Sequence, residues 1–292
     1  AQKDIENLKS EPLPTFQNTI EALDRVGKQL SRASSIFFNL NSAETNDEIQ
    51  KLAREIAPLL TEHSNNILLD SELFERVKQV FGQKNDLSLS PEQQMLLEKT
   101  YKSFVRNGAG LDKDQSEKLR EIDQKLAQLS LKFGENVLAE TNKFLHVVTT
   151  EEELEGLPDS IKDAAAALAE EKGHEGSWAF SLEHPSYIPA MTYAANRELR
   201  KTLFMASGTK SCKGDELDNR ENIKEIIKLR FDRAQLLGYK SHAHFVLEER
   251  MAKTPEEVTN FLTNLLEKAR PRAEEEMKEL SDFAQKKDGL DR

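Results

Sequence analysis

A histidine-based zinc site is the first chemistry to test in this sequence of 292 residues with six histidines. The motif His-Glu-x-x-His binds zinc on a helix, because its spacing puts both imidazoles on one face with the glutamate beside the metal-bound water. The one His-Glu pair, His174 and Glu175, is followed by Gly-Ser-Trp, so the second imidazole is missing. The flanking Gly173 and Gly176 predict a loop. The sequence therefore lacks this zinc motif.

His242 and His244 form a second candidate pair for a metal. Two residues apart on a helix, their side chains point about 200° away from one another and cannot share an ion. An extended segment would improve the geometry, but Phe245, Leu247 and Met251 keep helical spacing. We therefore expect one buried and one exposed histidine.

Nucleophilic catalysis has no candidate with a nearby base. The single cysteine, Cys212, lies between Ser211 and Lys213 without an imidazole close by in the sequence. No Gly-x-Ser-x-Gly elbow, phosphate-binding glycine loop or dinucleotide fingerprint occurs. One cysteine also excludes an internal disulfide, which agrees with a reducing compartment.

The segment LEHPSYIPAM has the most unusual local chemistry. Its two prolines predict a constrained loop that presents His184, Ser186 and Tyr187, and such loops often line binding sites. The alternative is structural: Tyr187 packs under the next helix, and His184 accepts a backbone donor.

The elements that must position these residues are mostly helical. Gly and Pro are few, at 12 and 9, while apolar residues recur three and four positions apart. This pattern predicts helices over residues 15–40, 45–60, 73–81, 90–107, 119–137, 158–172, 191–203, 219–237, 241–251 and from 254 onward. A capping box is expected at Thr45 with Glu48, and Pro271 should kink or split the last helix.

Two short segments rich in β-branched and aromatic residues are the strand candidates, FLHVV at 144–148 and WAFSL at 178–182. The expected fold class is therefore mostly α with a minor β element. We place a boundary near residue 150, between a helical domain over 1–150 and a second domain over 151–292.

Charge and hydropathy argue against nucleic acid and membranes as partners. The chain has 41 Lys and Arg against 52 Asp and Glu, a net charge of −11, and the basic residues alternate with acids, so nucleic acid is not an expected partner. No apolar run approaches the roughly 18 residues of a membrane span. The start AQKDIENLK has no signal region, so we expect the chain to begin inside a longer parent.

Three stretches in this order resemble the thimet oligopeptidase family of zinc peptidases, which includes oligopeptidase A and dipeptidyl carboxypeptidase. They are PLPTFQNTIEALDRVGKQLSRASSIFFNL, EHPSYIPAMTYAANRELRKTLFMASGTK and LLGYKSHAHFVLEERMAKTPEEVTNFL. With the helices between them, the resemblance covers essentially the whole chain. It implies two largely helical domains that flank a narrow channel for short peptides, with a small β region near the cleft.

In that family a His-Glu-x-x-His motif and a later glutamate hold Zn²⁺. None of these positions exists here, so the resemblance gives this chain no catalytic and no metal residue. It implies an amino-terminal fragment that forms one channel wall, is inactive alone, and meets short peptides and a missing carboxy-terminal catalytic half. Trp178, His184 and Tyr187 are the candidate channel-lining residues.

The family default for the intact enzyme is the cytoplasm, with the periplasm as the alternative. A functional alternative also stays open, a non-catalytic helical peptide-binding or adaptor module. A fragment of this kind should expose apolar surface and tend to self-associate.

Overall fold

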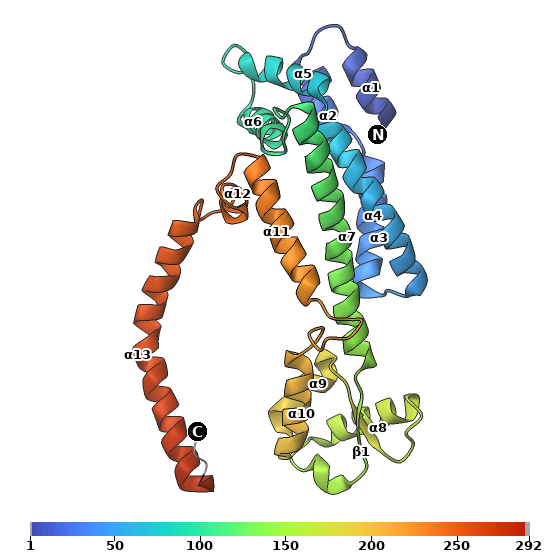
Figure 1. Cartoon of the computed structure of the whole chain (residues 1–292), viewed down its shortest axis with the longest axis vertical. Coiled ribbons are helices and arrows are strands. Elements are labelled where there is room, and N and C mark those ends of the chain that lie inside the picture. The colour runs from blue at the N-terminus through green and yellow to red at the C-terminus, as the bar shows by residue number, and fades with distance from the viewer. Residues whose placement is uncertain (1, 290–292) are drawn as a thin grey trace. The chain divides into compact units, whose positions relative to one another are not determined.

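The computed structural model describes residues 2–289 (Figure 1). It is mostly helical with one two-stranded sheet, as the sequence predicts. The chain divides into two compact units, one that extends to Leu229 and one that starts at Arg230. Among residues 2–289, no helix combines the length and the apolar character that crossing a membrane requires. The domain boundary near residue 150 stays a prediction.

The first part of unit 1 is a helical layer. Its elements are α1 (Gln2–Ser10), a π-helical turn η1 (Phe16–Glu21), α2 (Ala22–Arg25), α3 (Lys28–Ala43), α4 (Asp47–Leu68), α5 (Ser71–Gly82), α6 (Pro91–Arg106) and α7 (Lys113–Lys143). The long helices α4 and α7 run side by side (Figure 1). Phe16, Ile20, Leu73, Val77 and Leu97 are fully buried where η1, α5 and α6 pack together.

The continuous helix expected over residues 15–40 is wrong. The chain breaks between α2 and α3, where Val26 is extended and Gly27 has a φ of 71°. The left-handed conformation is accessible to glycine because it has no Cβ, and it turns the chain between the two helices. Apolar periodicity continues on both sides of the break, so periodicity alone could not reveal it.

Capping residues were predicted with mixed success. Ser90 accepts a hydrogen bond from the Gln93 backbone, and the Gln93 side chain accepts one from the Ser90 backbone, so the capping box before α6 is confirmed. The box expected at Thr45 is wrong by one residue. Asn46 caps α4 instead, because its amide oxygen reaches a free donor of the first turn and accepts from Ile49 N at 2.9 Å.

Both strand candidates form strands, somewhat shorter than predicted. β1 (His146–Val148) pairs antiparallel with β2 (Trp178–Phe180), and Val148 lies opposite Trp178. A short 3₁₀-helix (Glu151–Leu154) and α8 (Asp159–Glu171) connect them. α8 packs on β2, and Leu154, Ala165 and Phe180 lie in a second hydrophobic core below them.

The constrained loop expected at residues 184–189 is also wrong. His184 begins α9 (His184–Tyr193), which α10 (Arg197–Gly208) follows. Pro185 sits in the first turn, where the backbone N–H that proline lacks would have no helical partner. Pro189 lies inside this short helix. The backbone N–H that it lacks would have donated to the Pro185 carbonyl. The two prolines therefore permit a helix that sequence rules read as a loop.

The remaining helices are α11 (Arg220–Leu236), α12 (His242–Leu247) and α13 (Pro255–Asp288). α12 ends four residues before the predicted Met251, and Lys253 then adopts a φ of 65° to turn the chain. The cap of α13 at Thr254 is confirmed. Pro271 does not split α13, because the carbonyl that it leaves unpaired lies on a helix exposed to water.

Candidate functional site

The predicted site residues lie on the small sheet and the helix after it. Trp178 begins β2, and Tyr187 lies in the first turns of α9, and both are half-buried against the second hydrophobic core. His184 is exposed at the first position of α9. The structure therefore brings Trp178 and Tyr187 to one core and leaves His184 at its solvent edge. Their role as channel-lining residues stays a prediction.

Metal chemistry has no ligand set in the part of the chain that the structure describes. There, no three or more His, Cys, Asp or Glu side chains gather so that they could hold a metal ion. His174 and Glu175 lie in the exposed turn between α8 and β2, so the predicted loop is confirmed. The residues present thus do not fit a zinc centre.

The two histidines of α12 have different partners. His242 stacks on Phe245 with 6.3 Å between the ring centroids, while Nδ1 of His244 lies 2.7 Å from Ser241 Oγ. Burial lowers the pKa of His242 below its ordinary value, and nearby arginines lower it further. Both rings are half-buried, so the expectation of one buried and one exposed histidine is wrong. A helix of six residues is too short to cover one face completely.

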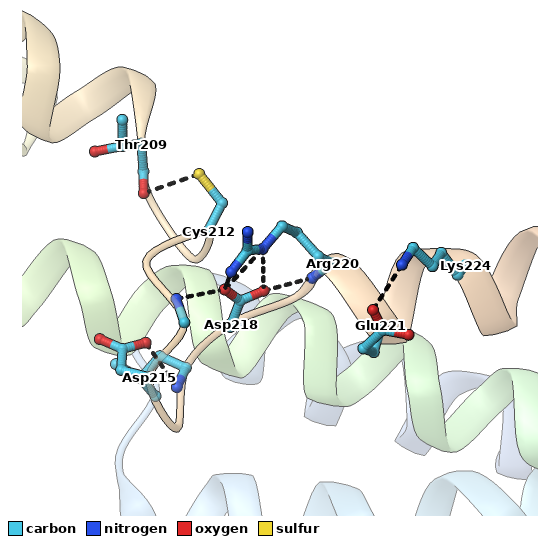
Figure 2. A network of polar contacts seen from close by, with 9 residues as sticks. Thr209, Cys212, Asp215, Asp218, Arg220, Glu221 and Lys224 are labelled. Atoms are coloured by element: carbon cyan, nitrogen blue, oxygen red, sulfur yellow. Dashed lines mark hydrogen bonds and ion pairs between the residues drawn. The ribbon is translucent and has the colours of Figure 1, made fainter.

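A polar network organises the connection between α10 and α11 (Figure 2). The Asp218 carboxylate accepts hydrogen bonds from the backbone of Gly214 at 2.6 Å and from the guanidinium of Arg220 at 2.6 Å. The Arg220 guanidinium holds the pKa of Asp218 well below its usual range and has its own pKa raised in return. In the same loop, the exposed Cys212 thiol donates to the Thr209 carbonyl at 3.3 Å.

Buried asparagines tie the start of α11 to α7. Asn219 is 1% exposed, donates to the Phe133 carbonyl at 3.1 Å, and accepts from the amides of Asn136 and Asn222 at 3.0 and 3.2 Å. Asn222 also donates to the Leu129 carbonyl at 3.1 Å. This ladder ties the start of α11 to α7 through the donors and acceptors of buried side-chain amides.

A second tie lies one turn further along α7. The buried Glu140 forms an ion pair with Lys213 of the α10–α11 connection, and its other carboxylate oxygen has no protein partner. Sequence reasoning missed Glu140, Asn136 and Asn219. The available signal was the placement of these polar residues within or beside apolar helical patterns, which indicates burial only once the partner helix is known.

In unit 2, α13 carries an uncovered apolar face, here called the α13 stripe. Its members recur at helical spacing and are more than half exposed: Phe261, Leu262, Leu265, Leu266, Met277, Leu280 and Phe283. Leu266, Ala269, Ala273 and Met277 also line a surface groove of about 630 Å³. Exposed apolar surface of this extent marks an interaction site in a folded protein.

Known proteins match this chain along almost its full length. The profile of Peptidase family M3 matches residues 190–292. Dipeptidyl carboxypeptidase of Escherichia coli K12 is 34% identical over 277 residues, which are 95% of this chain and 41% of that protein. Oligopeptidase A of Haemophilus influenzae is 32% identical over 290 residues, 98% of this chain and 42% of its own.

Oligopeptidase A of Escherichia coli K12 is 32% identical over 295 residues, 99% of this chain and 43% of that protein. The chain thus spans about two fifths of the length of these relatives, since the covered shares are 41%, 42% and 43%. The similarity extends through both units and includes the residues 190–292 that match the family profile. It is therefore not limited to one short motif. Residues 190–292 thus match peptidase family M3, and almost the whole chain is similar to the peptidases named above.

Proposed function

We propose that this chain is the amino-terminal part of a zinc-dependent oligopeptidase or peptidyl-dipeptidase and forms one wall of its substrate channel. The observation that carries the proposal is the similarity over 95% to 99% of this chain to peptidases of more than twice its length. The intact protein would hydrolyse short peptides. In this proposal residues 1–150 are a helical domain and residues 151–292 begin the peptidase domain, within which the family profile matches.

The metal and the catalytic groups would come from outside this chain. Neither a His-Glu-x-x-His motif in the sequence nor a metal-ligating cluster among residues 2–289 supplies them. A zinc ion polarises a peptide carbonyl and activates a bound water, and no described side chain here replaces those two actions. By itself the chain is therefore expected to be inactive.

The α13 stripe supports a specific partner for unit 2, the catalytic part of the same polypeptide. Leu265, Leu266 and Leu280 are each more than half exposed, which leaves their hydrophobic free energy unrealised in this chain. Relatives more than twice as long supply the polypeptide that could cover such a face. The proposed compartment is the cytoplasm, in keeping with one unpaired cysteine.

The test compares this chain with a version extended to the length of its relatives. Zinc content by atomic absorption and cleavage of a fluorogenic short peptide are measured for both, before and after treatment with a chelator. We expect about one zinc per molecule and chelator-sensitive cleavage only in the extended protein. Cleavage by the present chain would contradict the proposal.

The alternative function is a non-catalytic peptide-binding or adaptor module. The described residues contain no metal-ligating cluster. This absence favours the adaptor function only if the extended protein has no such cluster either. An extended protein that folds, binds no zinc and cleaves no peptide would replace the peptidase proposal with this one.

A further inference from the structure

Two surface cavities meet beside the start of α9. The larger, of about 600 Å³, lies between the end of α7, the end of α8 and the segment after β2. The smaller, of about 170 Å³, lies between α8, β2 and the first turn of α9. Leu168, Ser181 and Glu183 line both cavities, so one ligand could occupy the two together.

The larger cavity is lined by two carboxylates, Glu171 and Glu183, and two ammonium groups, Lys143 and Lys172. Its two lysines are already paired, Lys172 with Glu171 at 2.8 Å and Lys143 with Glu216 at 3.6 Å. Glu183 forms no ion pair within 4 Å among the described residues, although its charge contributes to raising the pKa of Lys172. Among the groups that line the larger cavity, Glu183 is thus the carboxylate without a direct ion pair.

The end of α7 adds partial negative charge to the larger cavity. Thr141, Asn142 and Lys143 form its last turn and line the larger cavity. The carbonyl groups at the end of a helix carry partial negative charge and favour cations nearby. A positively charged ligand group would therefore be stabilised between the helix end and the Glu183 carboxylate.

The smaller cavity is apolar and narrow. Ala164, Ala165 and Ala179 contribute only methyl groups to its lining, and Ile161 and Phe180 contribute larger apolar surfaces. Its volume of about 170 Å³ suits a small apolar group such as a methyl or isopropyl. A ligand that spans both cavities would therefore carry a cation next to a small apolar substituent.

We propose that this cavity pair binds a primary amine beside a small apolar group, the chemistry of the amino terminus of a short peptide. The amine would donate hydrogen bonds to the Glu183 carboxylate, and the first side chain would enter the smaller cavity. This binding needs neither a metal nor hydrolysis. It goes beyond the proposed channel wall and can fail or succeed independently of it.

The chain provides its own reporter for this site. Trp178 is the one tryptophan in the sequence and immediately precedes Ala179 and Phe180, which line the smaller cavity. Its fluorescence should therefore respond when the cavity fills. Three probes are titrated into the present chain: alanyl-alanine amide, its N-acetylated form, and propylamine.

We expect saturable fluorescence changes with alanyl-alanine amide and not with the N-acetylated peptide, which has lost the charged amine. Tighter binding of the peptide than of propylamine assigns the site to peptide termini, and equal binding assigns it to simple amines. Equal binding of the acetylated peptide, or no response to any probe at tens of millimolar, would overturn the proposal.

Two variants and a matched control locate the effect. Glu183→Gln removes the unpaired charge and should weaken peptide binding at least about tenfold, the loss expected for a hydrogen bond to a charged group. Glu170→Gln makes the same change on α8 outside both linings and should leave binding unchanged. Ala164→Leu, at an exposed position of α8, should block the smaller cavity without entering the core.

Binding that is unchanged in both Glu183→Gln and Ala164→Leu would also overturn the proposal. Both changes are at exposed positions, so each variant should fold, and circular dichroism provides the check. Because the readout is binding to this chain alone, a negative result here leaves the zinc and cleavage experiment unaffected.

Discussion

Gly156 is a residue at which the backbone allows little change. It follows the 3₁₀-helix between β1 and α8 with a φ of 86°, and the neighbouring Glu155 carbonyl accepts a hydrogen bond from Ala195 N at 2.7 Å. A Cβ placed on Gly156 would lie 2.4 Å from the Tyr193 carbonyl oxygen. This close approach holds the end of α9 against the loop, and only glycine permits it.

We therefore predict that Gly156→Ala lowers the free energy of unfolding by more than about 2 kcal/mol, since left-handed strain and a backbone clash combine. Gly110→Ala is the matched control, because a Cβ at Gly110 meets nothing within 4 Å. It should change the free energy of unfolding by less than about 0.5 kcal/mol. Denaturant melts of both variants measure this, and similar values for the two would contradict the prediction.

Among the elements, the start of α11 is tied to α7 by side-chain hydrogen bonds. The Asn219 side chain is 1% exposed. It donates a hydrogen bond to the Phe133 carbonyl and accepts hydrogen bonds from the amides of Asn136 and Asn222. Removal of this amide takes one hydrogen-bond partner from each of these three groups, and a buried polar group that loses its partner carries a desolvation penalty.

We expect Asn219→Ala to lower the free energy of unfolding by about 2 to 4 kcal/mol. The control is Asn264→Ala on the exposed surface of α13, which should be neutral or slightly stabilising because alanine favours helix. Thermal and denaturant melts of the two variants provide the comparison. A loss below about 1 kcal/mol for Asn219→Ala would mean that water replaces the ladder.

The elements also show how far sequence reasoning reaches. The Ser90 cap, the Thr254 cap and the short strands were predictable, because each depends on residues adjacent in the sequence. The break at Gly27 and the helix that starts at His184 were not, because tertiary packing decided between two locally acceptable conformations.

The candidate site also has features that the sequence predicts and features that only the structure shows. Tyr187 was predicted from its type and flanking prolines, and Trp178 from a strand candidate that fits the β region of the resembling family. The structure brings both to one core. The cavities beside Glu183 combine α7, α8 and the segment after β2, which are distant in the sequence. No spacing rule joins such segments, so these cavities required the three-dimensional structure.

For the whole molecule, the decisive feature is the α13 stripe. Leu266 and Leu280 are 59% and 63% exposed, and their spacing puts them on one face of a helix whose opposite side includes Glu267. Within unit 2 the stripe is exposed and can drive self-association. In the proposed intact enzyme it would be buried against the catalytic part.

The double variant Leu266→Gln and Leu280→Gln separates these two situations. In the present chain it should reduce self-association in sedimentation velocity and change the free energy of unfolding by less than about 1 kcal/mol, since both sites are exposed. In the extended protein the same change should cost about 4 kcal/mol or more, because two buried leucines would become polar. Glu267→Gln, on the opposite face, should have little effect in either protein. If the double variant were equally mild in both, the stripe would remain solvent-exposed in the longer protein and the catalytic part could not be its partner.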